Sequence, residues 1–291
     1  MIGTNATSLV KISVAGEIDN PRMPPLPATP YLITADGKPI VVPTFGGLVY
    51  NVRIGDPALG WQAELIQPGV SVRNQDPNAN TALGVYACVG NRVTVTSGAA
   101  DGATGTVIGK SGRFANQVIC DFDPDDLEQM SPGDKVQVQA HGVGLKLDDF
   151  PSVDLKSCSP RLLEALNLRV NEDGDLVVPV KGVAPNYLVG AGAGFNPEKS
   201  PISLQTSDPE ALADSGLTDL RFGDIVAVTD WDSRFSHGFL RGRAAVGVVC
   251  QGGSFRSGYG PGMVVFLTAE MNVLRFETSD SANIVELLGL H

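Results

Sequence analysis

Charged side chains are scarce in this chain of 291 residues. Asp, Glu, Lys and Arg make up 18% of it, whereas roughly 25% is typical of globular proteins. A surface with so few charges often loses area to subunit contacts, so the composition favours a homo-oligomer. The charges are also unbalanced, giving an acidic protein with a formal net charge of −11. Nucleic acids and anionic membranes bind through clustered Lys and Arg. We therefore expect neither as a partner, and expect a small-molecule ligand or substrate.

Cysteine and histidine are few as well. None of the four cysteines has a second cysteine at the short spacing that zinc ribbons use. Three histidines are too few for a histidine-based zinc or iron site within one chain. No cofactor is evident from these residues, which are Cys88, Cys120, Cys158, Cys250, His141, His237 and His291.

Long apolar runs are missing. No stretch approaches the ~18 apolar residues that span a bilayer. The start of the chain, MIGTNATSLVK, also lacks the charged and apolar regions of a signal peptide. We therefore expect a cytoplasmic protein with reduced thiols.

What the sequence does contain is a series of short apolar runs, separated by 34 glycines and 20 prolines. The alternating patterns RVTVTS and KVQVQA predict half-buried strands, and the continuously apolar runs predict strands buried on both faces. The predicted fold is mainly β, with barrel or sandwich units and a few short helices, and an α+β arrangement is the alternative. The predicted strands cover residues 9–16, 39–44, 92–97, 135–140, 175–180, 224–230, 244–249 and 263–268.

Helix signals are few. Ser159-Pro160 and Asp208-Pro209 each place a capping side chain before a proline in the first helical turn. Residues 281–288 predict a short terminal helix that ends at Gly289. This is too little helix for a doubly wound α/β fold, in which a helix follows almost every strand.

A change of composition near residues 150–160 predicts a boundary between two β-rich domains, 1–155 and 156–291, the second with short helices. Residues 90–122 resemble an SH3-like unit. Residues 19–31 hold five prolines. They predict an extended surface arm, or alternatively a proline-rich recognition segment.

Several segments together resemble an uncharacterised prokaryotic family known only as a domain of unknown function, number 4438. The resemblance implies a two-part, mainly β protein without an established activity. Members carry histidines where this chain has Glu64-Leu65, Ser111-Gly112 and Tyr259. A fainter likeness, to acetamidase/formamidase-type amidohydrolases, rests on acidic GD turns and PG loops. The segments that carry the first resemblance are GGLVYNVRIGDPALGW, QPGVSVRN, YACVGNRVTVTSGAADGATGTVIGKSG, GVGLKLDDFP, LRFGDIVAVTDWD and GVVCQGGSFRSGYGPGMVVFLT.

The segment DWDSRFSHGFLRGR follows an apolar strand and is the most site-like part of the chain. Side chains alternate along a strand, so Asp230 and Asp232 are expected on one face. They are candidates to hold a hard divalent cation, Mg²⁺ or Ca²⁺, or to supply a catalytic base. His237 is a second catalytic candidate, and Arg234 and Arg241 are candidate anion-binding groups. The alternative is a solvated hairpin in which Asp and Arg simply pair.

Two glycine-rich loops accompany this segment. GAGAG contains Gly190, Gly192 and Gly194, but no helix follows, so it does not fit a dinucleotide fingerprint. Its backbone amides are candidate oxyanion donors. In the other loop, Cys250 is a candidate nucleophile with His237 as base, and Tyr259 is a candidate ligand-binding group. A buried and inert Cys250 is the alternative.

Glu64 and Asn74 are the candidates in the N-terminal half, the first as a catalytic carboxylate and the second as a ligand-binding amide. The sequence thus predicts an enzyme acting on a small polar molecule, with hydrolysis of an amide or cyclic amide as the favoured reaction. The alternative is a non-catalytic protein, either ligand-binding or part of an oligomeric structure.

Overall fold

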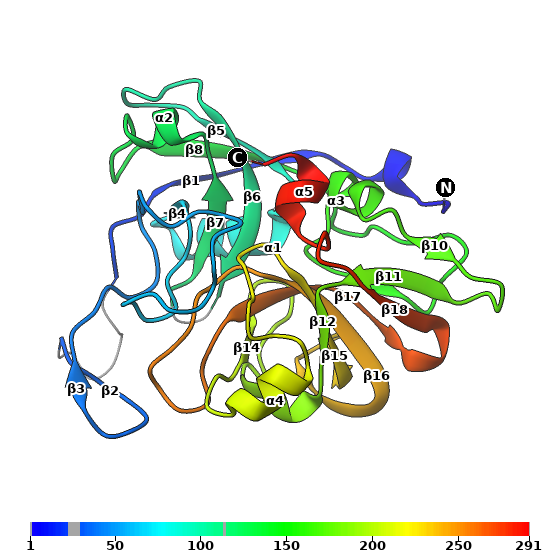
Figure 1. Cartoon of the computed structure of the whole chain (residues 1–291). Helices are drawn as coiled ribbons and strands as arrows, with labels where there is room; N and C mark the ends of the chain where they lie inside the picture. Colours follow the sequence, from blue (N-terminus) through cyan, green and yellow to red (C-terminus); the bar gives the residue numbers. More distant parts are fainter. Residues whose placement is uncertain (1, 23–29, 113–114, 291) are drawn as a thin grey trace.

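The computed structural model of this chain describes residues 2–22, 30–112 and 115–290 (Figure 1). These residues form mainly β-strands with a few short helices, as the sequence predicts. The middle of the proline-rich segment 19–31 lies outside the described residues. No helix formed by the described residues is long and apolar enough to cross a membrane.

A closed six-stranded barrel occupies the N-terminal half of the chain. Strand β8 (Lys135–Ala140) shows how its interior is formed: Val136, Val138 and Ala140 are buried while Lys135 and Gln137 are exposed, so one face of the strand supplies the barrel interior. The strand order is β1 (Ile12–Ile18), β4 (Val70–Arg73), β7 (Gln117–Asp121), β6 (Thr104–Ser111), β5 (Arg92–Val95) and β8, which pairs back with β1.

A larger mixed sheet forms the centre of the C-terminal half. Its strand order is β12 (Gly182–Ala184), β15 (Ile225–Asp232), β16 (Gly238–Val249), β17 (Gly262–Glu270), β14 (Ile202–Leu204) and β13 (Val189–Ala191). Strand β9 (Asp154–Leu155) also pairs with β17, on Leu267 and Thr268, whereas β14 pairs with Gly262 and Met263. The chain segments next to β9 and β14 therefore meet along one edge of β17.

The remaining strands and helices are short. One small sheet contains β10 (Arg169–Val170), β11 (Leu176–Val180) and β18 (Leu274–Thr278), and another contains β2 (Leu32–Ile33) and β3 (Pro39–Ile40). The α-helices are α1 (Pro77–Tyr86), α2 (Pro124–Leu127), α3 (Pro160–Ala165), α4 (Pro209–Asp214) and α5 (Ile284–Leu288), and the 3₁₀ helices are η1 (Ala6–Ser8), η2 (Asn186–Leu188) and η3 (Met271–Val273).

The two halves of the chain share one hydrophobic core. The barrel interior is a separate cluster, but Ile108 and Ile119 of the barrel wall pack into the same cluster as Val246 and Phe266 of the large sheet. Strand β6 contacts both β16 and β17. The barrel is thus fixed against the sheet, and polar groups between them are shielded from water.

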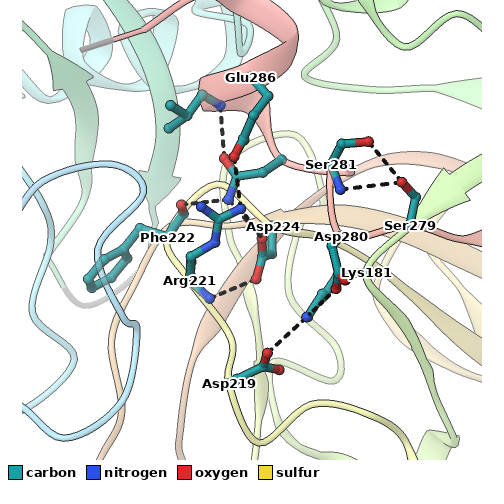
Figure 2. Close-up of polar contacts among 11 residues, drawn as sticks. Lys181, Asp219, Arg221, Phe222, Asp224, Ser279, Asp280, Ser281 and Glu286 are labelled. Atoms are coloured by element: carbon teal, nitrogen blue, oxygen red, sulfur yellow. Dashed lines mark hydrogen bonds and ion pairs between the residues drawn. The ribbon is translucent and has the colours of Figure 1, made fainter.

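Polar contacts tie the C-terminal segment to the large sheet (Figure 2). Asn283 caps α5, since its side chain accepts from the Val285 N–H, and it also donates to buried Asp224 at 2.7 Å. Arg221 contacts Glu286 at 3.0 Å. Lys181 lies 2.9 Å from Asp280 and 3.0 Å from Asp219. Figure 2 draws both contacts as dashed lines. Together, these contacts anchor the C-terminal segment to the rest of the fold.

Candidate functional site

The two predicted carboxylates of β15 do not face the same way. The pairing of β15 with β16 shifts register around Asp230, whose φ is +53°. This bulge turns Asp230 toward the N–H of Gly242, which donates to its carboxylate at 2.7 Å. Asp232 instead accepts from Arg234 Nε and lies 3.0 Å from Arg243 Nε. The expected alternation fails because a bulge residue breaks the two-residue period of the strand.

His237 is buried, with 1% of its surface exposed. Its Nε2–H donates to the carbonyl oxygen of Ser200 at 2.9 Å, and its Nδ1 accepts from the Ser233 hydroxyl at 2.9 Å. Burial lowers the pKa of His237, so the ring is neutral. Both ring nitrogens are thus used within the fold. Arg241 lies on the exposed part of the same hairpin.

Cys250 lies in the shared core, fully buried. Its thiol donates to the carbonyl oxygen of Lys110 at 3.6 Å. Burial raises the pKa of Cys250 to about 12, so the thiolate that a nucleophile requires is not formed near neutral pH. This placement matches the inert alternative for Cys250.

Arg256 contacts both Glu64 and Tyr259. The Glu64 carboxylate is fully buried and accepts from Arg256 Nε at 2.8 Å, the Ser254 hydroxyl at 2.8 Å and the Phe255 N–H at 3.0 Å. The Arg256 guanidinium in turn lies 4.2 Å from the centre of the Tyr259 ring. These three donors to the Glu64 carboxylate all belong to residues 254–256, so the cluster fastens that loop to the N-terminal half.

The GAGAG loop packs against neighbouring backbone. A Cβ on Gly190 would lie 2.2 Å from the carbonyl oxygen of Gly258, and the Gly194 N–H donates to the carbonyl of His237 at 2.7 Å. Gly192 has a φ of +111°, which glycine adopts readily. Asn74 lies apart from this loop, on the barrel, where its side chain donates to Ala15 at 2.8 Å.

The sequence reasoning missed a buried lysine between the barrel and the sheet. Lys110, on β6, is fully buried. Its Nζ lies 2.8 Å from Ser157 Oγ and donates to the carbonyl oxygens of Glu198 at 2.6 Å and Val85 at 3.4 Å. Burial lowers the pKa of Lys110 to about 8, while the nearby Cys88 and Glu198 charges oppose this shift. A lysine with such a pKa can lose its proton near neutral pH.

Ser157 lies where β9 leaves the edge of β17. The N–H of Lys156 still donates to Phe266 of β17, and the next residue, Ser157, turns away with a φ of +49°. A residue with a side chain rarely adopts this conformation, and such strain is concentrated at functional sites. In the described part of the chain, the N–H groups of Ser157 and Cys158 donate no hydrogen bond.

Ser157 forms part of the wall of a cavity of about 580 Å³. The cavity lies between the loop of residues 142–148, the β9 segment and Glu198. Pockets of about 300–1,000 Å³ hold small ligands. The Lys110–Ser157 pair therefore stands at the edge of a space large enough for a small substrate.

The predicted hairpin borders this site. Arg243, which contacts Asp232, also lies 3.7 Å from Asp154 in the cavity wall. On the neighbouring segment, Lys156 pairs with the Glu198 carboxylate at 2.8 Å. Asp232 is thus linked to the cavity through Arg243, although it does not line it. Among the described residues, no group of three or more His, Cys, Asp or Glu side chains is arranged to hold a metal ion.

The comparisons with known proteins define the family. The N-terminal model of the domain of unknown function DUF4438 matches residues 31–164, and the C-terminal model of the same domain matches residues 165–288. The chain therefore belongs to this family, as the sequence resemblance implied. It is also similar to the protein in "Crystal structure of TM1086", at 36% identity with a TM-score of 0.92, over 100% of this chain and 99% of that one. No curated protein matches the chain.

Proposed function

We propose that this protein hydrolyses an amide bond of a small molecule, with Ser157 as nucleophile and Lys110 as its general base. The observation that carries the proposal is the 2.8 Å contact between Lys110 Nζ and Ser157 Oγ at the cavity wall. A serine is a weak nucleophile unless an adjacent base accepts its proton, and serine–lysine pairs can serve this role. The reaction class is the one favoured by the sequence, but the reacting pair is different.

The steps follow from the positions of the two side chains. Neutral Lys110 accepts the hydroxyl proton of Ser157 while Oγ bonds to the amide carbon. The C–N bond then breaks, the Lys110 ammonium returns the proton to the departing nitrogen, and an acyl ester remains on Ser157. Water, deprotonated by Lys110, attacks this ester and releases the carboxylic acid and the free serine.

The backbone beside Ser157 supports the same proposal. An attacked carbonyl develops negative charge on its oxygen, which needs hydrogen-bond donors already in place. The N–H groups of Ser157 and Cys158 donate to no other acceptor in the described residues, so both are candidates for this role. The positive φ of Ser157 is further support, because the fold maintains a conformation that costs energy.

The first test is covalent labelling with a fluorophosphonate, which transfers its phosphonyl group to an activated serine as the P–F bond breaks. We expect one adduct, on Ser157, located by peptide mass spectrometry. Ser157→Gly should remove the adduct, and it keeps the backbone unstrained because glycine tolerates a φ of +49°. Lys110→Met should slow labelling by roughly 10²–10⁴-fold, the usual contribution of a general base.

The matched control is Ser152→Ala, since Ser152 is an exposed serine five residues earlier that does not line the cavity. It should label at the wild-type rate. An adduct on another residue, or unchanged labelling of a folded Lys110→Met protein, would overturn the proposal. Folding of each variant is checked by circular dichroism before labelling.

A further inference from the structure

The cavity beside Ser157 contains charged groups that the proposed reaction does not use. Two lysines and three carboxylates belong to its wall: Lys146, Lys156, Asp148, Asp154 and Glu198. The Lys156–Glu198 pair, 2.8 Å apart, neutralises one charge of each sign. Two carboxylates and one lysine remain.

The two remaining carboxylates are poorly neutralised. Asp148 forms no ion pair with any described residue. Asp154 has a side chain that is 46% exposed, and its cationic neighbour is Arg243 at 3.7 Å. Arg243 is closer to Asp232, at 3.0 Å, so it neutralises Asp154 only in part.

The two carboxylates and the remaining ammonium group differ in the length of their side chains. Asp148 donates its N–H to the carbonyl oxygen of Gly3 at 2.9 Å, and Asp154 belongs to β9, paired with Thr268. Lys146 also has a fixed backbone, since its N–H donates to Asn5 Oδ1 at 2.8 Å. Asp148 and Lys146 are both exposed, but the long side chain of Lys146 can carry its ammonium group away from the cavity into water, whereas a short Asp side chain stays near its backbone.

From this imbalance, and resting on the proposed amide hydrolysis, we infer that the substrate is an amide bearing an ammonium or guanidinium group, which Asp148 and Asp154 bind. Asp154 precedes Ser157 by three residues, which span at most about 11 Å. The cation is therefore joined to the amide carbonyl by a short linker. The net charge of −11 favours the approach of cations over anions.

Three acetamides with the same alkyl arm test this inference. N-acetylcadaverine ends in an ammonium group, N-hexylacetamide in a methyl group and 6-acetamidohexanoate in a carboxylate. We expect kcat/KM for the ammonium compound to exceed that for the methyl compound by about tenfold, as two surface ion pairs would give. The carboxylate compound should be the poorest substrate.

Matched variants locate the effect. Asp148→Asn and Asp154→Asn should each lower the ratio of kcat/KM between the ammonium and methyl compounds. Asp149→Asn makes the same change at the adjacent exposed position, which does not line the cavity, and should leave the ratio unchanged. Equal rates for the two compounds, or an equal loss in all three variants, would overturn the inference and leave the hydrolase proposal standing.

Binding to the Ser157→Gly protein separates the two proposals, since this protein lacks the nucleophile. Titration calorimetry should show tighter binding of N-acetylcadaverine than of N-hexylacetamide, with the difference reduced by Asp148→Asn. Selective binding with no hydrolysis by the wild-type protein would count against the hydrolase alone. Equal binding of the two compounds would count against the cationic substrate.

Discussion

At the scale of single residues, burial governs the chemistry of this protein. It raises the pKa of the Cys250 thiol and lowers that of the Lys110 amine, so the same shared core keeps the thiol protonated and favours the neutral amine that the proposed reaction needs. Water stabilises the charged forms of both groups, and its exclusion favours the neutral thiol and the neutral amine alike.

The lowered pKa of Lys110 predicts how the rate depends on pH. The base is the neutral amine, which is the minor form below its pKa of about 8 and the major form above it. We expect kcat/KM for an amide to rise with pH through a midpoint near 8 and to level off above about pH 9. A pH–rate profile of the wild-type protein checks this, with folding followed over the same range. A flat profile between about pH 6 and 10 would contradict the assignment of Lys110.

Neither member of this pair was recognisable from its sequence neighbours. Lys110 lies in VIGKS and Ser157 in LKSCS, without a known motif around either. They are 47 positions apart, and the carbonyl that both contact belongs to Glu198, 88 positions beyond Lys110. A lysine inside an apolar run was the one available signal, and it does not reveal whether the side chain faces the core.

At the scale of elements, the capping signals at Ser159 and Asp208 correctly located the starts of two helices. Both side chains accept from a backbone N–H in the first turn, of α3 and α4 respectively. The terminal helix was predicted from residue 281, whereas α5 begins at Ile284 after its cap, Asn283.

The prediction missed α1 and α2, which begin after Asp76 and Asp123. The weak apolar pattern of α1 explains its omission, because buried Asn80 bonds to the barrel where an apolar side chain would be expected.

Removing the cap of α5 is expected to lower the free energy of unfolding. Asn283 accepts from Val285 and donates to both Asp224 and Phe222, so Asn283→Ala removes three contacts and leaves buried Asp224 with fewer donors. We expect a destabilisation of roughly 2–4 kcal/mol from the lost cap and the unsatisfied carboxylate. Urea unfolding followed by circular dichroism measures it.

Ser281→Ala is the matched control for this change, since Ser281 bonds to Ser279 in the same segment but is exposed. Its effect should stay within about 0.5 kcal/mol, as for most surface substitutions. Similar losses in the two variants would show that the cap is not the source of the stability.

At the scale of the whole molecule, the shared core predicts cooperative unfolding of the two halves. Trp61 belongs to the N-terminal half and packs against the shared cluster, and Trp231 belongs to the C-terminal half and lies within that cluster. In Trp61→Phe and in Trp231→Phe, the remaining tryptophan reports on one half. We expect its fluorescence and the circular dichroism to change at the same urea concentration within each variant, because loss of either half exposes the core of the other.

We expect Trp231→Phe to lower stability only modestly. Trp231 Nε1 is buried without a hydrogen-bond partner among the described residues, so the change removes no hydrogen bond. Midpoints that differ between the two probes in one variant would mean that the halves unfold independently. The sequence boundary near residue 155 would then mark separately stable domains.

The sequence by itself determined the mainly β class, the positions of eight of the eighteen described strands, two helix starts and the family. These features depend on residues close together in the chain, through alternation, capping and turn-forming glycines. Only the tertiary structure decided which polar residues meet. A bulge at Asp230 separated the two predicted carboxylates, and the edge of β17 brought Ser157 beside Lys110 from the barrel. The physical reason is that the chemistry of Lys110 depends on desolvation and on partners far away in the chain, which no local pattern records.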